Sequence, residues 1–317
     1  MAMDTRDTGT TRDEAFSAAA RAAEHAPSVC NTRPWAISVE AGRIVLGADP
    51  ERGLDVADPL SRELVLSCGA ALYTIRVALR AHGVAPALTV LPDPDLPGRL
   101  AEVTAEGRLE PDGAAQAQWA AVTRRRTHRG LFASDVDDVR LVRALLRAAA
   151  DEGAELRPLT DEPLIRSLAG LVSAAEHLQR HDRERSLELA RWVRPPGDRA
   201  PEGVHAEDFP DTSDADSLFP GRDYGQGRVR GMLAVRGMAT GTVALLTTAT
   251  DTRAAWLAAG QALQRVLLTA AAAGVAAAFH TQPLEEPPLR AFLAERFCEG
   301  AHPQMVMRLG RTAAGAA

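Results

Sequence analysis

The chain has 317 residues and a mass of 33.7 kDa, which corresponds to one large domain or two domains of ordinary size. Hydrophobic residues make up 46% and charged residues 25%, which excludes a chain that is disordered throughout. The formal net charge is −6, so bulk electrostatic binding to nucleic acid or to an anionic membrane is not expected.

The lack of recognisable targeting signals and the pattern of cysteines predict a cytoplasmic protein. No apolar run reaches the length of a membrane span, and the polar residues 1–12 lack the apolar centre of a signal peptide. Cys30, Cys68 and Cys298 are odd in number, and their spacings match no metal-site template. We therefore expect reduced thiols, no metal, and neither a membrane nor a nucleic-acid partner.

Helical and strand-like patterns alternate along the chain. We predict helices at about 12–25, 60–82, 114–123, 135–151, 162–192, 251–273 and 286–297, and strands at 35–40, 43–46, 87–91, 100–104, 154–159, 242–248 and 304–309. Residues 193–223 are rich in Pro, Gly, Asp and Arg and have little periodicity. Such a segment is a lid, a binding loop or a disordered stretch, and we favour a lid.

An internal repeat divides the chain. Eleven positions between Arg62 and Arg99 have identical counterparts 191 residues later, from Arg253 to Arg290, without a gap. A period this long indicates duplication of a whole domain. We predict two related halves, residues 1–112 and 113–317, the second with a lid-like insertion at about 193–223. The predicted fold class is α+β, with antiparallel sheets packed by long helices.

The first candidate segment is the loop 27–35, between a helix and a strand. It contains the only asparagine of the chain, Asn31, together with Ser28 and Thr32. Amide and hydroxyl groups on a loop bracketed by prolines can read the polar edge of a flat heterocycle. The alternative is an ordinary helix end and turn with incidental polarity.

The second candidate segment is the arginine-rich run 124–129. Four arginines and the hydroxyl of Thr127 would form a strong anion site if they converged, and a phosphomonoester would suit them. No aromatic residues are interleaved, which argues against a nucleic-acid track. The alternative is a solvated helix end.

The third candidate segment, 279–285, directly follows the repeated helix of the second half. His280 could act as a metal ligand or an acid–base group, although a buried or capping histidine is the commoner case. The chain contains no dinucleotide-binding glycine motif, no Walker A loop, no nucleophile elbow and no HExxH motif.

Four motifs together give the chain a family resemblance: "APSVCNTRPW", "DPLSRELVLSCGAAL", "RRRTHR" and "WLAAGQALQRVLL…QPLE". With them, the sequence resembles the nitroreductase-like flavoprotein superfamily, and more closely its Acg-type branch, over about residues 12–311. In that branch two nitroreductase-like halves are fused in one chain. The resemblance implies an internally duplicated pseudo-dimer with FMN at the interface between the halves.

The resemblance also assigns residues to the cofactor site. The implied FMN contacts are Pro27, Ser28, Asn31, Thr32, Trp35, Arg125, Arg126, Thr127, Arg129, Gln282, Pro283, Leu284, Arg308 and Arg311, and Glu285 completes the turn that approaches flavin N5. Cys30 and Arg33, where the branch usually has His and Gln, and His280 are candidates for residues near the substrate.

The repeat offset predicts one FMN per chain. The first-half counterpart of the arginine-rich run would fall before residue 1. At the same offset, the second-half counterpart of the Asn31 loop would be residues 218–222, with Arg222 in place of Asn31. One interface therefore has both parts of a site and the other has neither.

The expected function is that of an FMN-dependent oxidoreductase. NADPH or NADH, or an organic substrate, would reduce the flavin at N5, and an acceptor would reoxidise it in a ping-pong cycle. No catalytic side chain is assigned, because the cofactor carries the chemistry. The alternative is an FMN storage or sequestration protein whose lid covers the flavin. The partner is a small molecule, and the chain would be a monomer or a homodimer.

Overall fold

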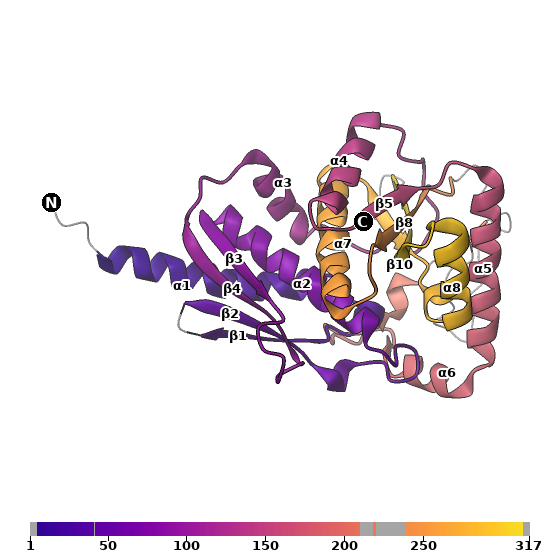
Figure 1. The fold of residues 1–317 in the computed structure, drawn as a ribbon, viewed down its shortest axis with the longest axis horizontal. Helices are drawn as coiled ribbons and strands as arrows, with labels where there is room; N and C mark the ends of the chain where they lie inside the picture. The colour runs from indigo at the N-terminus through magenta and orange to yellow at the C-terminus, as the bar shows by residue number, and fades with distance from the viewer. Residues whose placement is uncertain (1–4, 41, 210–217, 220–238, 313–317) are drawn as a thin grey trace.

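Two four-stranded antiparallel sheets form the framework of the computed structural model, which describes residues 5–40, 42–209, 218–219 and 239–312 (Figure 1). The first sheet has the order β1-β2-β4-β3, and the second has the order β5-β8-β10-β9. The strands of the first are β1 (Trp35–Glu40), β2 (Arg43–Ala48), β3 (Val84–Val90) and β4 (Arg99–Arg108). Those of the second are β5 (Glu155–Pro158), β8 (Thr242–Thr248), β9 (Ala276–Phe279) and β10 (His302–Gly310).

Each sheet is covered by two helices that occupy the same places in the chain order. The first half runs α1, β1, β2, α2, β3, β4, and the second runs α4, β5, β8, α7, β9, β10. The four helices are α1 (Thr5–Ala22), α2 (Arg62–Ala81), α4 (Val139–Ala150) and α7 (Arg253–Ala272). Antiparallel sheets with helices give the predicted α+β class, and the shared element order agrees with the repeat in the sequence.

The helices α2 and α7 cross at the centre of the molecule, as Figure 1 shows. Seventeen of the twenty residues of α2 are buried, which explains why this helix is apolar on nearly all sides. Its length and hydropathy would suit a membrane span, but 83% of its most apolar stretch is buried within the protein. It is therefore a core helix. Around it, Ile44, Leu46 and Val103 close the first hydrophobic core.

The second half carries the insertions. Between β5 and β8 lie α5 (Glu162–His181), α6 (Arg183–Ala190), the short parallel pair β6 (Val193–Arg194) and β7 (Val204–His205), and the 3-10 turn η4 (Ala206–Asp208). The helix α8 (Pro287–Phe297) separates the 3-10 turn η5 (Gln282–Leu284) from β10, and α3 (Gly113–Val122) joins the halves. The other 3-10 turns are η1 (Ala23–His25), η2 (Val29–Asn31) and η3 (Pro50–Arg52).

Three sequence expectations need correction. The helix predicted at 162–192 is two helices, because Asp182 ends α5 and its side chain caps α6. The ungapped match between Arg99 and Arg290 does not persist in space: Arg99 begins β4, whereas Arg290 lies in α8. Structural equivalence at the 191-residue offset extends as far as Leu88 and Phe279, which pair with corresponding positions of β4 and β10.

The third correction concerns the counterpart of the loop 27–33. In the first half this loop joins the α1–η1 helical segment to β1, and the corresponding link from α4 to β5 is only residues 151–154. The segment 218–222 lies instead in the insertion before β8, and Arg222 is outside the described residues.

Candidate functional site

The loop 27–33 lies at the interface between the halves and has an uncommon backbone. Cys30, Asn31 and Arg33 have φ angles of 45°, 53° and 50°, in the left-handed region that non-glycine residues seldom adopt. Ser28 Oγ accepts a hydrogen bond from the Arg33 amide at 2.9 Å, and Ser67 Oγ of α2 accepts one from the Val29 amide at 3.1 Å. Backbone strain of this kind concentrates at functional sites.

The arginine-rich run contacts η1, the helical turn just before this loop. Arg125 Nη2 donates to the carbonyl oxygen of His25 at 3.3 Å, while Arg125 Nε is buried and has no hydrogen-bond partner among the described residues. Burial, together with the neighbouring charges of Arg126 and Arg129, lowers the pKa of Arg125 to about 10. The site therefore concentrates the positive charges of three arginines, of which Arg125 and Arg129 are partly buried and Arg126 is exposed.

Positive charge also surrounds the His25 ring. Desolvation lowers the pKa of this imidazole, and the charges of Arg126, Arg33 and Arg125 lower it further. Two carboxylates balance part of the cluster: Glu24 lies 3.2 Å from Arg33, and Asp208 of the insertion lies 3.8 Å from Arg129. An oxyanion bound here would gain several charge-assisted contacts.

The third segment joins the site through β9. Thr127 forms an isolated parallel bridge with Ala277, and the His128 amide donates to the carbonyl oxygen of Ala277 at 2.8 Å. The arginine-rich run thus lies alongside the strand that leads directly into the turn 282–285. Two segments that are 150 residues apart in the sequence are brought together in this way.

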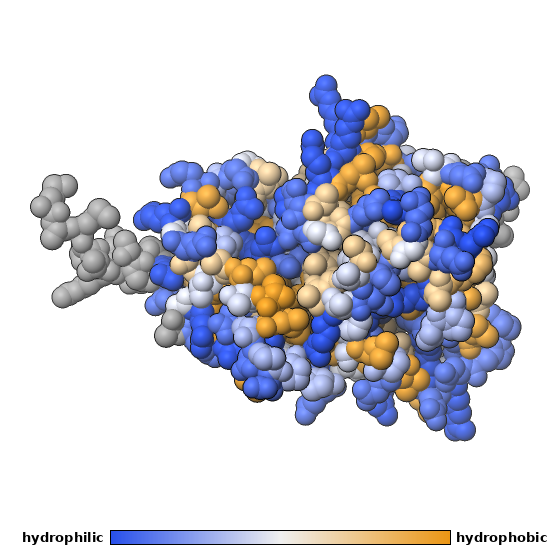
Figure 2. Space-filling model, in the orientation of Figure 1, coloured by the Kyte–Doolittle hydropathy of each residue, from blue (hydrophilic) through white to orange (hydrophobic). Residues whose placement is uncertain are grey.

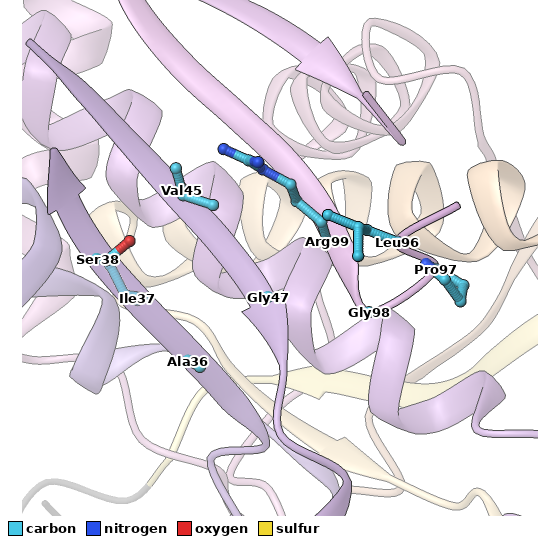
Figure 3. A pocket seen from close by; sticks show the side chains of 9 residues that line it. All are labelled: Ala36, Ile37, Ser38, Val45, Gly47, Leu96, Pro97, Gly98 and Arg99. Atoms are coloured by element: carbon cyan, nitrogen blue, oxygen red, sulfur yellow. The ribbon is translucent and has the colours of Figure 1, made fainter. Parts of the chain in front are cut away.

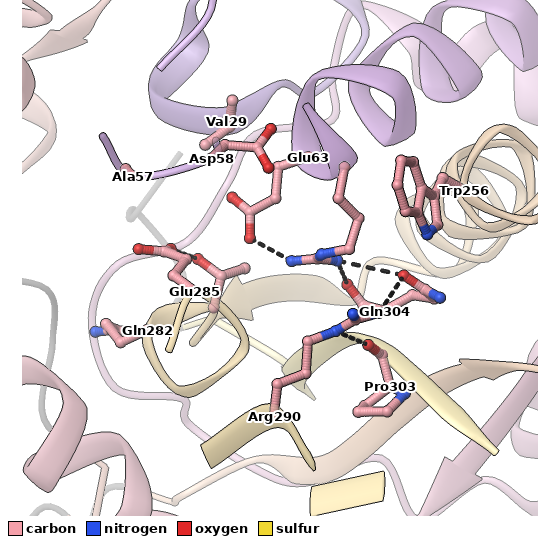
Figure 4. Close-up of polar contacts among 12 residues, drawn as sticks. Val29, Ala57, Asp58, Glu63, Trp256, Gln282, Glu285, Arg290, Pro303 and Gln304 are labelled. Carbon is pink, nitrogen blue, oxygen red and sulfur yellow. Dashed lines mark hydrogen bonds and ion pairs between the residues drawn. The ribbon is translucent and has the colours of Figure 1, made fainter. Parts of the chain in front are cut away.

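The turn 282–285 is buried and faces the first half. Gln282, Pro283 and Leu284 are all buried, and Gln282 Oε1 has no hydrogen-bond partner among the described residues. Figure 4 places Gln282 and Glu285 opposite the first-half residues Val29, Ala57, Asp58 and Glu63. Thr32 Oγ1 is likewise buried without a partner in the described part of the chain. Unsatisfied buried polar atoms call for an explanation, and a ligand is one.

Arg308 and His280 form a hydrogen bond between their buried side chains. Arg308 Nε donates to His280 Nε2 at 2.8 Å, and Arg308 Nη1 donates to the carbonyl oxygen of Thr240 at 2.7 Å. The guanidinium lies 5.4 Å from the ring of Phe132 and 5.7 Å from that of Phe219, and burial lowers its pKa to about 10. Because His280 Nε2 accepts this bond, the buried structural interpretation of His280 fits the geometry better than a metal or acid–base role.

The insertion covers the Asn31 loop. Asn31 Nδ2 donates to the carbonyl oxygens of Pro201 and Gly203 at 3.0 and 2.9 Å, and the Gly203 amide donates to the Asn31 carbonyl at 2.9 Å. The amide protons that we expected to read a heterocycle are thus directed at the insertion. Cys30 is also buried, in an apolar cluster that includes Val204, so its thiol is not exposed to a substrate.

The remaining predicted residues have structural contacts. Trp35 Nε1 donates to Glu24 at 3.3 Å, next to Arg33. Arg311 is exposed and donates to the carbonyl oxygen of Ala273 at 3.2 Å. Among the described residues, no three His, Cys, Asp or Glu side chains converge as metal ligands would.

A separate cavity of about 440 Å³ lies on the first sheet, away from these segments (Figure 3). Its lining comes from β1, β2, residues 96–98 of the loop before β4 and Arg99 at the start of β4, and Arg99 is its one charged residue. Figure 2 shows that hydrophilic residues cover much of the surface in that view, with apolar groups in scattered patches. No sequence-predicted site residue lines this cavity.

Comparison with known proteins identifies the family. The chain matches no protein-family model. A Mycobacterium tuberculosis protein, provisionally named an NAD(P)H nitroreductase, is 36% identical over 293 residues, which cover 91% of this chain and 82% of the relative. The chain belongs to the nitroreductase family. The resemblance drawn from the sequence is thereby confirmed.

Other members of the nitroreductase family are more distant. The Acg nitroreductase of M. tuberculosis, also provisionally named, is 29% identical over 312 residues, covering 96% of this chain and 91% of that protein. A solved nitroreductase-type structure from Anabaena variabilis has a TM-score of 0.48 at 12% identity and covers 86% of this chain and 69% of that one. An FMN-bound nitroreductase from Bacteroides fragilis has a TM-score of 0.39 at 15% identity, covering 63% and 90%.

Within this nitroreductase-family chain, sequence reasoning missed the residues that hold the turn 282–285. Gln179 Nε2 donates to the Gln282 carbonyl at 2.9 Å, and Gln282 Nε2 donates to Glu176 at 3.1 Å. Arg185 pairs with Glu285 at 2.6 Å. Glu176 and Gln179 lie in α5, and Arg185 lies in α6, about one hundred residues before the turn. Neither helix carries a recognisable motif, so only the fold could reveal these contacts.

Proposed function

We propose that this chain is an FMN-dependent oxidoreductase that transfers hydride from NAD(P)H, or from an organic substrate, to a small-molecule acceptor. Its family membership and the name of its relative, an NAD(P)H nitroreductase, support the proposal. The observation that carries it is the convergence of Arg125, Arg126 and Arg33 around His25, at the interface between the halves.

The arginine cluster fits the phosphate of FMN. Arg125 is partly buried, and its Nε atom is buried without a hydrogen-bond partner among the described residues, so a phosphate dianion would supply acceptors for it. Arg126, Thr127 and Arg129 would add donors from the same run. Arginine suits this role because its planar fork matches two phosphate oxygens at once.

The loop 27–33 and the turn 282–285 fit the ring system. Thr32 Oγ1 and Gln282 Oε1 are buried polar atoms: the hydroxyl can donate to a ring nitrogen or oxygen, and the amide oxygen can accept from a ring N–H. When bound, FMN supplies the N5 atom that accepts and donates hydride. The residues of the loop and the turn would orient the ring and exclude water, and no protein nucleophile is needed.

We also infer that the halves meet near residues 112–113 and that the chain binds one FMN. The second-half counterpart of the loop 27–33 is the four-residue link 151–154. Two of its residues are acidic, and Glu152 pairs with Arg265 at 2.8 Å and with Arg76 at 2.5 Å. This short link, whose Glu152 is already paired with two arginines, lacks the amide and hydroxyl side chains of the Asn31 loop.

One observation favours FMN storage as a second candidate. Asn31 and the segment 201–203 exchange three hydrogen bonds, so the insertion covers the loop proposed to contact the ring. If that cover stays closed, a hydride donor cannot reach the flavin.

An absorption spectrum of the purified protein, followed anaerobically after NADPH and then NADH, tests both candidates. We expect flavin bands equivalent to one FMN per chain that are bleached by a nicotinamide. Bands bleached by dithionite but by neither nicotinamide would favour storage or reduction by another substrate. Absence of flavin, even after FMN is added, would rule out both.

A further inference from the structure

Arg185 of α6 forms a buried ion pair with Glu285 of the turn 282–285 and a partly buried one with the adjacent Glu286. Arg185 Nη2 lies 2.6 Å from Glu285 Oε2, and Arg185 Nη1 lies 2.8 Å from Glu286 Oε1. The side chains of Arg185 and Glu285 are only 5% and 2% exposed, so solvent screens this pair little. Asp182 caps α6 by accepting from the Arg185 amide at 3.1 Å, which fixes the start of the helix.

Helix α6 is also hydrogen-bonded to the first half of the chain. Glu188 accepts hydrogen bonds from the amides of Val56 and Ala57, both at 2.9 Å, through its two carboxylate oxygens. Arg185 Nη2 also reaches the carbonyl oxygen of Ala57 at 3.4 Å. Helix α6 therefore connects the turn 282–285 to the segment 56–57 that faces it across the interface.

We propose that Arg185 is a positioning residue that sets the conformation and charge of the turn 282–285 and thereby the affinity and reduction potential of bound FMN. This inference rests on the proposed function, because it requires the turn to face the flavin ring. The insertion then has a second role besides covering the Asn31 loop: its helices hold the surface against which the ring lies.

Several carboxylates and the Arg185 guanidinium lie close together beside the turn 282–285. Glu285 and Glu286 belong to the turn region, Glu176 approaches from α5, and Asp58 and Glu63 face it from the first half. Arg185 bridges the first two of these carboxylates. Removing its guanidinium adds net negative charge near the turn, which disfavours electron transfer to a bound flavin and lowers the midpoint potential.

The test compares Arg185→Met with Arg183→Met, an exposed arginine on the same helix. FMN affinity is measured by quenching of flavin fluorescence, and midpoint potential by anaerobic dye equilibration. We expect the FMN dissociation constant of R185M to rise by about tenfold or more, because one partner of a buried pair is lost, while R183M stays within about twofold of wild type.

The potential should also depend on pH in a way that a purely structural role would not produce. Without Arg185, the carboxylate of Glu285 binds a proton more readily, which cancels the added negative charge at low pH. The deficit in midpoint potential of R185M should therefore be larger at about pH 8.5 than at about pH 6. An equal deficit at both values would overturn the charge argument.

Two further variants keep the inference testable if R185M does not fold. Arg185→Lys retains the charge but not the paired geometry of the guanidinium, so its FMN dissociation constant should rise by less than about tenfold, whereas wild-type affinity would overturn the inference. Glu285→Gln should restore much of the affinity in an R185M background. A wild-type chain that binds no FMN would overturn the proposed function itself, whereas normal wild-type binding with an unchanged R185M overturns this inference alone.

Discussion

Gly69 of α2 and Gly260 of α7 lie against each other where the two central helices cross. A Cβ atom on Gly69 would lie 2.9 Å from the Gly260 Cα, and one on Gly260 would lie 2.8 Å from the Gly69 Cα. The two glycines are also partners in the 191-residue sequence repeat. The repeat predicts that an approximate twofold axis relates the halves, and in that case this contact between equivalent positions lies near the axis.

The crossing predicts a severe effect of Gly260→Ala. The new Cβ would lie 1.9 Å from the Leu66 carbonyl oxygen, so the helices must separate, and we expect a loss of about 3 kcal/mol in unfolding free energy. Gly170→Ala in α5 is the matched control, because a Cβ there meets nothing within 4 Å. It should stabilise the protein by roughly 0.5–1 kcal/mol through helix propensity. Urea unfolding of both variants checks the prediction, and equal midpoints would contradict it.

The arginine cluster predicts a local loss of cofactor affinity. Arg125→Ala should weaken FMN binding by more than tenfold, because a charge-assisted hydrogen bond contributes about 1.5–3 kcal/mol. Arg124→Ala provides the control, since Arg124 is exposed and its Nε donates to the Ala120 carbonyl at 3.0 Å. Titration of apoprotein with FMN measures both. Equal affinity in the two variants would remove the phosphate site from Arg125.

The contacts of Asn31 predict how the insertion is held closed. Asn31→Gly keeps the left-handed backbone, which glycine adopts without strain, and removes the two side-chain hydrogen bonds to residues 201 and 203. We expect faster proteolysis within the segment 195–203 and faster reduction of bound flavin by NADPH. Ser38→Ala, on the exposed face of β1, should alter neither rate. Unchanged proteolysis in N31G would show that other contacts hold the segment.

The charged surroundings of His25 predict a dependence of stability on pH. The folded-state pKa of His25 lies below its ordinary value, so the unfolded chain binds this proton more readily. The corresponding stability is fully present above about pH 6.5 and is lost as the pH falls through the folded-state pKa. His25→Gln should reduce the slope of unfolding free energy between about pH 7 and pH 5. An identical slope in the variant would argue against the cluster.

Much of the site could be predicted from the sequence because its parts are local motifs. The arginine-rich run, the loop with Asn31 and the turn after the second repeated helix each stand out by composition or spacing. The duplication was also visible, since repeated Gly and Arg positions persist despite the alanine-rich background. Helix and strand periodicity then predicted the α+β class, because each element must bury one apolar face.

The tertiary structure alone decided which parts meet and what holds them. Asn31 donates a hydrogen bond to the insertion, and Arg308 donates one to His280. Arg185 forms an ion pair with Glu285, one hundred residues away in the chain. Such contacts depend on side-chain directions after helices and sheets have packed, and no spacing along the chain encodes them. The sequence by itself determined the family, and it predicted the two halves and the residue types of the candidate site. The packing of the insertion against both halves decided which hydrogen-bond and ion-pair partners these residues have.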